Sequence, residues 1–197
     1  MSIAGNLIWM SGRALAPAPL DLVQRFVNTA ELLENREDLD SSEALGRWLT
    51  AEEFSECGAP SEAEFSRALR VREGIRSVLR VHSGGCPDPD ASELLNRAVD
   101  RAGLRPQFTA DSRIGVSVAG GGVDGVLGRL LAIAVIANTD GSWSRLKACS
   151  NPDCGWAFYD RSRNRAGRWC EMNTCGARHK MRNFRATHRP PDALSSK

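Results

Sequence analysis

Four cysteines in the C-terminal quarter constrain this chain more than any other feature. Residues 149–175 read CSNPDCGWAFYDRSRNRAGRWCEMNTC, which places two C-x4-C pairs with fifteen residues between them. Two cysteine pairs on tight turns can converge so that four thiolates surround one metal ion tetrahedrally. The spacing therefore predicts one structural Zn²⁺ ion, held by Cys149, Cys154, Cys170 and Cys175.

Zinc is the favoured occupant, although four sulfurs could also hold iron or an iron–sulfur cluster, or pair as two disulfides. Six cysteines without a secretory signal point to a reducing cytoplasm, where disulfides are rare. His179 could replace one thiolate, but the four-cysteine set is already complete. A closed thiolate cage leaves no open position for catalysis, so the zinc is predicted to be structural. Cys57 and Cys86 have no partner pattern and are interpreted as ordinary thiols.

Charge is divided unevenly along the chain. Residues 1–142 hold 14 arginines against 20 acidic residues, whereas residues 143–189 hold 11 lysines and arginines against 3 acidic residues. Such asymmetry indicates that the basic part meets a polyanion, although a solvated basic surface without a partner would have the same composition. A Zn²⁺ ion with four thiolates carries a net charge of about −2, so the segment would remain strongly basic with the metal bound.

Two basic stretches in this segment are candidate contacts for nucleic acid. The loop at residues 160–168 (DRSRNRAGR) is predicted to grip phosphates, because the planar guanidinium binds them bidentately. Residues 177–187 are predicted to form a helix with Met181 and Phe184 on a packing stripe, continued by His188. The adjacent stripe is cationic, ends at Arg189, and is predicted to read bases in the major groove. The predicted contacts are Arg161, Arg163, Arg165, Arg178, Lys180, Arg182 and Arg185.

Aromatic side chains surround the cysteines. Trp156, Phe158 and Trp169 are interpreted as a miniature core of the metal module, and Tyr159 as the one most available for another role.

Apolar periodicity predicts that residues 1–141 form a mostly helical domain whose core can stand without metal. Ser41 or Ser42 can cap one helix, and Ser61 with Glu64 has the capping-box spacing. Gly120, Gly121 and Gly122 break the chain; no lysine follows them, which favours a joint over a phosphate loop. The other helices are expected near residues 21–33, 91–102 and 123–138, and a hairpin at residues 104–109 and 114–118. The helix at residues 123–138 is predicted to bury Val126, Leu127, Leu130, Leu131, Ile133, Ala134 and Ile136.

The predicted fold class is therefore α+β: a mostly helical N-terminal domain with a small β-hairpin, followed by a small four-cysteine zinc-finger module that ends in a helix. The predicted domains are residues 1–141, residues 142–189 and a tail, residues 190–197. The first ten residues have no basic start or long apolar stretch, so no export is expected. The most apolar run, residues 130–137, is far shorter than the roughly 20 residues of a membrane-spanning helix. We therefore expect a cytoplasmic protein without a membrane partner.

At these residues the chain resembles the CGNR zinc-finger family, whose metal module follows a domain called ABATE. The resemblance covers nearly the whole chain. Where the family has CGNR, this sequence has Cys175-Gly176-Ala177-Arg178, so the asparagine side chain and any base-reading or capping role are missing. The matching stretches are residues 22–29 (LVQRFVNT), 120–133 (GGGVDGVLGRLLAI), 143–154 (WSRLKACSNPDC) and 156–165 (WAFYDRSRNR), then Trp169-Cys170 and Cys175-Gly176.

This resemblance implies a bacterial, cytoplasmic regulator of transcription in the stress response. The zinc module would bind DNA, and the N-terminal domain would sense a signal or contact a protein partner. RNA binding by a zinc knuckle and protein association without nucleic acid are the alternatives, and a homodimer is possible although no heptad seam is visible. An enzyme is not predicted, because the three histidines, His82, His179 and His188, form no recognisable nucleophile–base pair.

Overall fold

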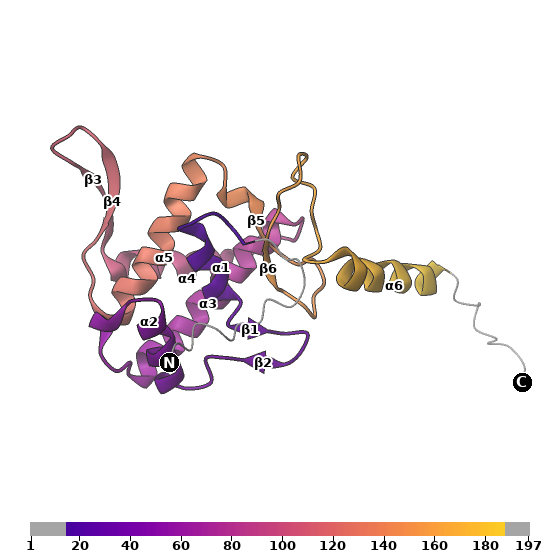
Figure 1. Ribbon diagram of the computed structural model, residues 1–197, viewed down its shortest axis with the longest axis horizontal. Helices are drawn as coiled ribbons and strands as arrows, with labels where there is room; N and C mark the ends of the chain where they lie inside the picture. The colour runs from indigo at the N-terminus through magenta and orange to yellow at the C-terminus, as the bar shows by residue number, and fades with distance from the viewer. Residues whose placement is uncertain (1–14, 188–197) are drawn as a thin grey trace, which may run out of the picture.

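Helices make up most of the protein, and the strands form short antiparallel pairs (Figure 1). The computed structural model describes residues 15–187. It confirms the predicted α+β fold. In chain order the elements are α1 (Leu20–Val27), β1 (Ala30–Glu31), β2 (Arg36–Glu37), α2 (Ser42–Ala51), η2 (Ser55–Cys57), α3 (Glu62–His82), α4 (Pro89–Ala102), β3 (Leu104–Phe108), β4 (Ile114–Val118), α5 (Gly122–Thr139), η3 (Trp143–Arg145), β5 (Leu146–Ala148), β6 (Ala157–Tyr159), η4 (Met172–Gly176) and α6 (Ala177–Thr187).

The residues predicted to cap the starts of helices do so in the structure. The Ser41 side chain accepts a hydrogen bond from the Ala44 N–H at the start of α2. Ser61 and Glu64 form the capping box of α3, in which each side chain bonds the other residue's backbone N–H. These contacts satisfy N–H groups that have no partner inside the helix, which is why the helices begin there.

Helix α1 is shorter than predicted, because it ends at Val27 instead of continuing to residue 33. The Thr29 hydroxyl donates to the Phe26 carbonyl at 2.8 Å, and Asn28 exchanges two hydrogen bonds with the backbone of Ala157. Side chains that bond backbone in this way compete with the helical hydrogen bonds. Ala30 fits the apolar period but begins a small β1–β2 pair.

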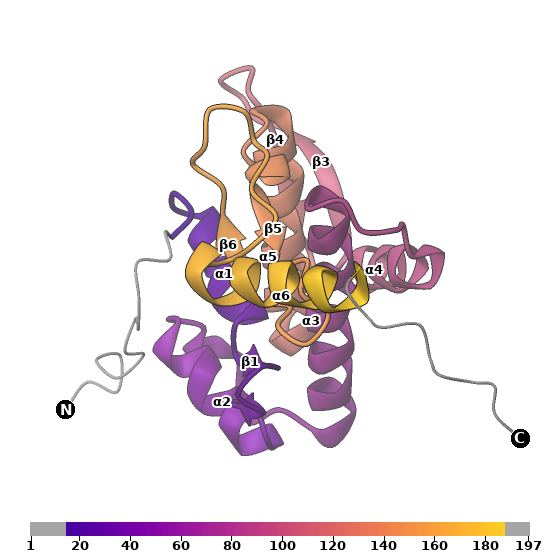
Figure 2. The same cartoon turned by 90° about the vertical axis from the view of Figure 1, so that its right-hand side faces the viewer.

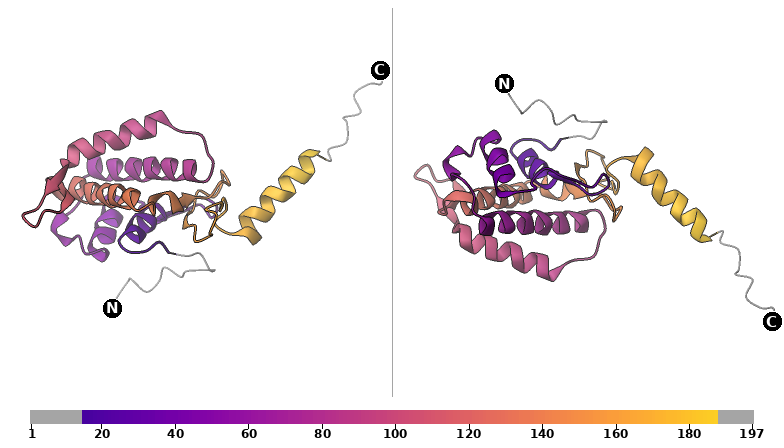
Figure 3. Two further views of the ribbon diagram at one scale, coloured as in Figure 1. Left: turned by 90° about the horizontal axis from the view of Figure 1, so that it is seen from above. Right: turned by 90° about the horizontal axis from the view of Figure 1, so that it is seen from below.

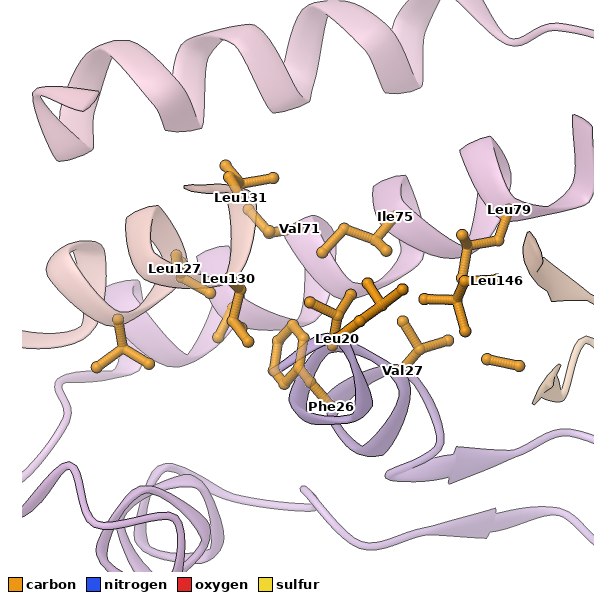
Figure 4. Packing of buried hydrophobic residues seen from close by; sticks show 14 of the residues in the cluster. Leu20, Phe26, Val27, Val71, Ile75, Leu79, Leu127, Leu130, Leu131 and Leu146 are labelled. Atoms are coloured by element: carbon orange, nitrogen blue, oxygen red, sulfur yellow. The ribbon is translucent and has the colours of Figure 1, made fainter. Parts of the chain in front are cut away.

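The core lies where α1, α3 and α5 meet, with α4 packed on α3 and α5 on the side away from α1 (Figure 3). Phe26 of α1 points toward Leu130 of α5, and Leu146 of β5 lies beside Leu79 of α3 (Figure 4). The labelled core residues are Leu20, Phe26, Val27, Val71, Ile75, Leu79, Leu127, Leu130, Leu131 and Leu146.

This core continues past the predicted boundary at residue 141. Leu146, Ala148 and Ala157 belong to the same buried cluster as the helices. The Ser83 hydroxyl at the end of α3 donates to the Ala148 carbonyl at 2.6 Å, and the His82 Nδ1 lies 2.8 Å from the Leu146 carbonyl oxygen. The domain boundary at residue 141 stays a prediction. The buried side chains on the two sides of this position pack into one core.

Helix α5 is the one helix among residues 15–187 that is long and apolar enough to cross a membrane, and half of it is buried inside the protein. Val126, Leu127 and Leu130 lie in the core, as predicted. The prediction that Ile136 is buried is wrong, since it is 51% exposed. At its start, the Gly120 N–H donates to the Ala102 carbonyl at 2.9 Å, so this glycine allows a close approach to α4.

Two elements extend from the body at opposite ends of the molecule: the β3–β4 hairpin and α6 (Figures 1 and 3). In Figure 2, α6 lies in front of the helical body, on the viewer's side of β5 and β6. The cysteine-rich segment therefore lies between the helical core and a projecting basic helix.

Candidate metal centre and basic surface

The first cysteine pair is positioned by the β5–β6 pair. Cys149 directly follows β5, and its N–H donates to the Trp156 carbonyl at 2.9 Å. The chain then turns, because the N–H groups of Cys154 and Gly155 donate to the Asn151 carbonyl at 3.0 and 3.3 Å. The strands thus bracket this cysteine turn, and the fifteen residues between the two pairs contribute only the single short strand β6.

The second pair lies just before α6: Cys175 belongs to the irregular helical turn η4 (Met172–Gly176), and Cys170 stands two residues before it. The Cys175 N–H donates to the Glu171 carbonyl at 3.1 Å, and the Thr174 hydroxyl donates to the Glu171 carboxylate at 2.9 Å. This turn brings the Cys175 sulfur to 3.8 Å from the Cys170 sulfur.

The four sulfur atoms converge with the geometry that a tetrahedral ion requires. All four Sγ atoms of Cys149, Cys154, Cys170 and Cys175 lie within 4.8 Å of one another, and the Cys154 and Cys170 sulfurs are 3.6 Å apart. Zinc–thiolate bonds of about 2.3 Å in a tetrahedron place the sulfurs about 3.8 Å apart. The four residues therefore fit a single metal ion, as the spacing predicted.

The electrostatics of the cluster favour a cation. Hydrogen bonds from Cys154 and Cys170 lower the pKa of Cys149 to about 2. The hydrogen bond to Cys149 raises the pKa of Cys154 to about 12, and the pKa of Cys170 is raised for the same reason. One thiolate thus suppresses ionisation of its neighbours, and a bound cation is what lets all four sulfurs carry charge together.

Outside the sulfurs, Asn151 joins the centre to α6. Its side-chain N–H₂ lies 3.8 Å from the Cys175 sulfur, and its oxygen accepts from Arg182 at 2.9 Å. Trp156 packs against the cysteines as predicted, and Trp169 stacks on His179 with ring centroids 4.7 Å apart. The His179 ring therefore has an aromatic partner beside the sulfur cluster.

The helical core holds the first cysteine turn directly. Arg76, which is 1% exposed, donates to the Gly155 carbonyl at 2.6 Å and to the Val27 carbonyl at 2.7 Å. Gly155 has a φ of +58°, and a Cβ there would lie 3.1 Å from the Arg76 Cδ, so only glycine suits this position. The first half of the metal centre is thus fixed by residues of α1 and α3.

The arginine loop, residues 160–168, is folded around a buried ion pair. Lys147 lies 2.8 Å from the Asp160 carboxylate and also donates to the Gly167 carbonyl at 3.0 Å. The same carboxylate accepts from the N–H groups of Ser162 and Gly167 at 2.9 and 2.7 Å. The loop therefore has a defined shape, although its arginines are exposed.

This ion pair makes stability depend on pH. Burial disfavours the charge of Asp160, but hydrogen bonds from Lys147 and Ser162 outweigh burial and hold the pKa of Asp160 well below its ordinary value. Such a carboxylate stabilises the fold above its unfolded pKa, near about 4, and the contribution is lost as the pH falls through the folded pKa. We expect Asp160→Asn to unfold at lower urea than the wild type by a constant difference from about pH 5 to 8, and the difference to shrink below about pH 4.

Any acid effect on the cysteines is common to both proteins, so the difference between their urea midpoints isolates the carboxylate. An equal difference at pH 3 and pH 7 would contradict the assignment.

The seven basic residues predicted to contact nucleic acid fall into two groups, according to whether their side chains form hydrogen bonds within the protein. Arg161 donates to the Leu15 carbonyl at 3.1 Å, Arg165 to the Ser144 hydroxyl at 3.3 Å, and Arg182 to Asn151. These three guanidinium groups are already used within the protein. The others are exposed and form no ion pair or side-chain hydrogen bond within residues 15–187: Arg163, Arg178, Lys180 and Arg185.

The predicted packing stripe of α6 is wrong. Met181 and Phe184 are 54% and 58% exposed, because α6 projects from the body. Tyr159, predicted to be available, packs instead against the main core. His188 and Arg189 lie outside the described residues, as does the predicted tail.

Sequence reasoning missed the residues that support the site from the helical core, namely Arg76, Gln24 and Asn28. Gln24 and Asn28 both donate to the Ala157 carbonyl, at 3.2 and 2.9 Å. A signal was present: Gln24 and Asn28 stand four and eight residues after the buried Leu20, in the same row of the helical pattern, which indicates buried hydrogen-bond partners.

Comparison with known families agrees with this arrangement. A sequence model of the CGNR zinc finger matches residues 145–188. The ABATE model, described as "Putative stress-induced transcription regulator", matches residues 20–138. No curated protein matches the chain. The ABATE match spans more than half of the chain, and the chain therefore belongs to the ABATE family and carries a CGNR zinc finger at its C-terminal end.

Proposed function

We propose that this protein is a cytoplasmic transcription regulator in which one structural Zn²⁺ ion orders a basic module that binds double-stranded DNA. In this proposal, the N-terminal domain senses a signal or binds a protein partner. The observation that carries the proposal is the position of the exposed cations. Arg163 on the loop and Arg178, Lys180 and Arg185 on α6 are exposed on the two elements that flank the second cysteine pair in the chain.

Zinc is the ion that suits four thiolates at this spacing, and its role here is to fold the module. The segment from Asp160 to α6 has few buried apolar residues apart from those around the sulfurs. Metal binding therefore supplies the stability that a larger core would otherwise provide. The four ligands leave no open coordination position, which supports a structural role over a catalytic one.

The two basic elements suit different parts of a duplex. The loop has a defined shape before binding, so Arg163 can meet a phosphate at little entropic cost. Helix α6 has 11 residues and stands away from the body, which suits insertion into the major groove. Its exposed Met181 can meet the methyl groups of thymine, and Arg178 can pair with guanine.

The Arg182 side chain has a different role in this proposal. Its hydrogen bond to Asn151, and through Asn151 to the Cys175 sulfur, sets the angle at which α6 leaves the metal centre. We expect its loss to disturb the helix orientation in addition to removing a positive charge.

Salt dependence tests the proposal. Each phosphate contact releases counterions, so Arg163→Ala and Arg185→Ala should each reduce the slope of log K against log salt concentration by about 1 on every duplex. Arg178→Ala should instead cost ~1–3 kcal/mol on the preferred duplex alone. Fluorescence anisotropy on several duplexes, including DNA beside the protein's own gene, measures both effects.

The matched control is Arg97→Ala, an exposed arginine of α4 paired with Glu93. It should leave affinity and slope unchanged. Tighter binding to single-stranded RNA than to any duplex at the same salt would favour the RNA alternative. Unchanged affinity and slope in all three basic-surface variants would favour protein association.

A further inference from the structure

The β3–β4 hairpin has one apolar face that continues past the body of the protein. Its register pairs Leu104 with Val118, Pro106 with Val116 and Phe108 with Ile114. Paired residues share a face, so these six lie on one side, and Arg105, Gln107, Gly115 and Ser117 lie on the other. Phe108 and Ile114, near the tip, are 76% and 71% exposed.

The root of this face rests on helix α5. A Cβ at Gly128 would lie 2.8 Å from the Val118 Cγ1, so a glycine is required for the strand to seat there. Leu104 packs against the main core. The apolar face is therefore covered at the root and has no cover at the tip among the described residues.

The two edges of the hairpin differ. The Thr109 N–H donates to the Arg113 carbonyl at 2.9 Å, which makes this a hydrogen-bonded pair. Because such pairs alternate along an antiparallel ladder, the N–H and C=O groups of Ile114 and Val116 point away from β3. Among residues 15–187, no backbone hydrogen bond from outside the β3–β4 pair reaches them. On the other edge Pro106 has no N–H, which closes it to pairing.

Natural sheets protect open edges with charges, prolines or bulges. Strand β4 reads IGVSV and has none of these over its five residues. An open, uncharged edge beside an exposed apolar face is what a strand-pairing interface requires.

We propose that β4 pairs with β4 of a second copy across a two-fold axis at Val116, so that two hairpins form one four-stranded antiparallel sheet. Self-pairing suits this strand because it carries no charge, and no like charges would stand opposite each other. In this register Ile114 lies opposite Val118 of the second copy. The exposed tip of each hairpin thereby reaches the root of the other, where α5 provides an apolar floor.

The placement of the hairpin supports this partner. It extends from the end of the molecule opposite α6 (Figures 1 and 3). Pairing through β4 therefore leaves the cysteine cluster and the basic surface of both copies uncovered. The inference does not depend on DNA binding.

Sedimentation velocity of the full-length protein over a range of concentrations tests the interface. We expect the wild type to be a dimer and Val116→Lys, which places two lysines opposite each other, to weaken it by at least about 100-fold. Gln107→Lys is the matched control, since it puts the same charge on the polar face of β3 and should leave the dimer intact.

A cross-link tests the register without relying on a destabilising change. In a Cys86→Ser background, which removes the exposed native thiol, Val116→Cys should form a covalent dimer under mild oxidation. The two Cα atoms of a hydrogen-bonded pair are about 5.5 Å apart, within the range of a disulfide. Gln107→Cys should not cross-link. A wild type that stays monomeric at every concentration, or a dimer that survives Val116→Lys and shows no Val116→Cys cross-link, overturns the proposal.

Discussion

Replacing Cys175 with serine is expected to reduce the zinc content of the purified protein from about one ion per chain to near zero. A metal bound by four thiolates contributes on the order of 10 kcal/mol or more to folding, so no other single change should have a larger effect. Serine at Cys149, Cys154 or Cys170 should act in the same way. Inductively coupled plasma mass spectrometry of the full-length protein measures this content.

Loss of the metal should destabilise some parts of the protein more than others. Strands β5 and β6 are held by α3 and by Asn28, and the arginine loop is held by the Lys147–Asp160 pair, whereas residues 169–187 depend on the sulfur cluster. We therefore expect hydrogen exchange to rise most in residues 169–187 and to change least in α1, α3 and α5. Cys86→Ser, at an exposed cysteine, is the control and should retain the metal. Full zinc content in the Cys175 variant would refute the site.

The second large effect is expected from Arg76→Ala. The Arg76 guanidinium satisfies the carbonyls of Val27, Ala30 and Gly155 and pairs with Glu73 at 2.8 Å. Alanine would leave these buried acceptors without a donor and open a cavity in the core. We expect a loss of about 3–5 kcal/mol in the free energy of unfolding, measured by urea denaturation.

A second measurement separates the local role of Arg76 from general damage. Because it holds the Gly155 carbonyl, its loss should also weaken zinc binding, which a chelator competition detects. Arg97→Ala removes an exposed arginine from an i, i+4 pair and should change stability by less than about 0.5 kcal/mol. A similar small change in Arg76→Ala would show that the buried contacts contribute little.

Much of the site was predictable because its signals are local. Cys149 to Cys175 form a spacing that only a few chemistries use, and metal geometry then requires the four sulfurs to meet. Ser61 with Glu64 predicts a helix start for the same kind of reason, since both partners lie within one turn. The β3–β4 hairpin and α6 also follow from short-range periodicity and were predicted with bounds close to those observed.

Periodicity did not reveal what covers an apolar face. Ile136 continues the stripe of α5 and Phe184 that of α6, yet both are exposed because the body does not extend to meet them. A sequence pattern reports only that a face is apolar, and its burial depends on elements distant in the chain.

The amino-acid sequence by itself thus determined the metal ligands, most helix starts and the basic character of the C-terminal segment, because each depends on residues close together in the chain. Only the tertiary structure decided which arginines remain available, since Arg182 is engaged by Asn151 across the cysteine turn. It also decided that the first cysteine turn is anchored in the helical core. That anchoring rests on contacts such as Asn28 with Ala157, which are separated by 129 residues and leave no local pattern.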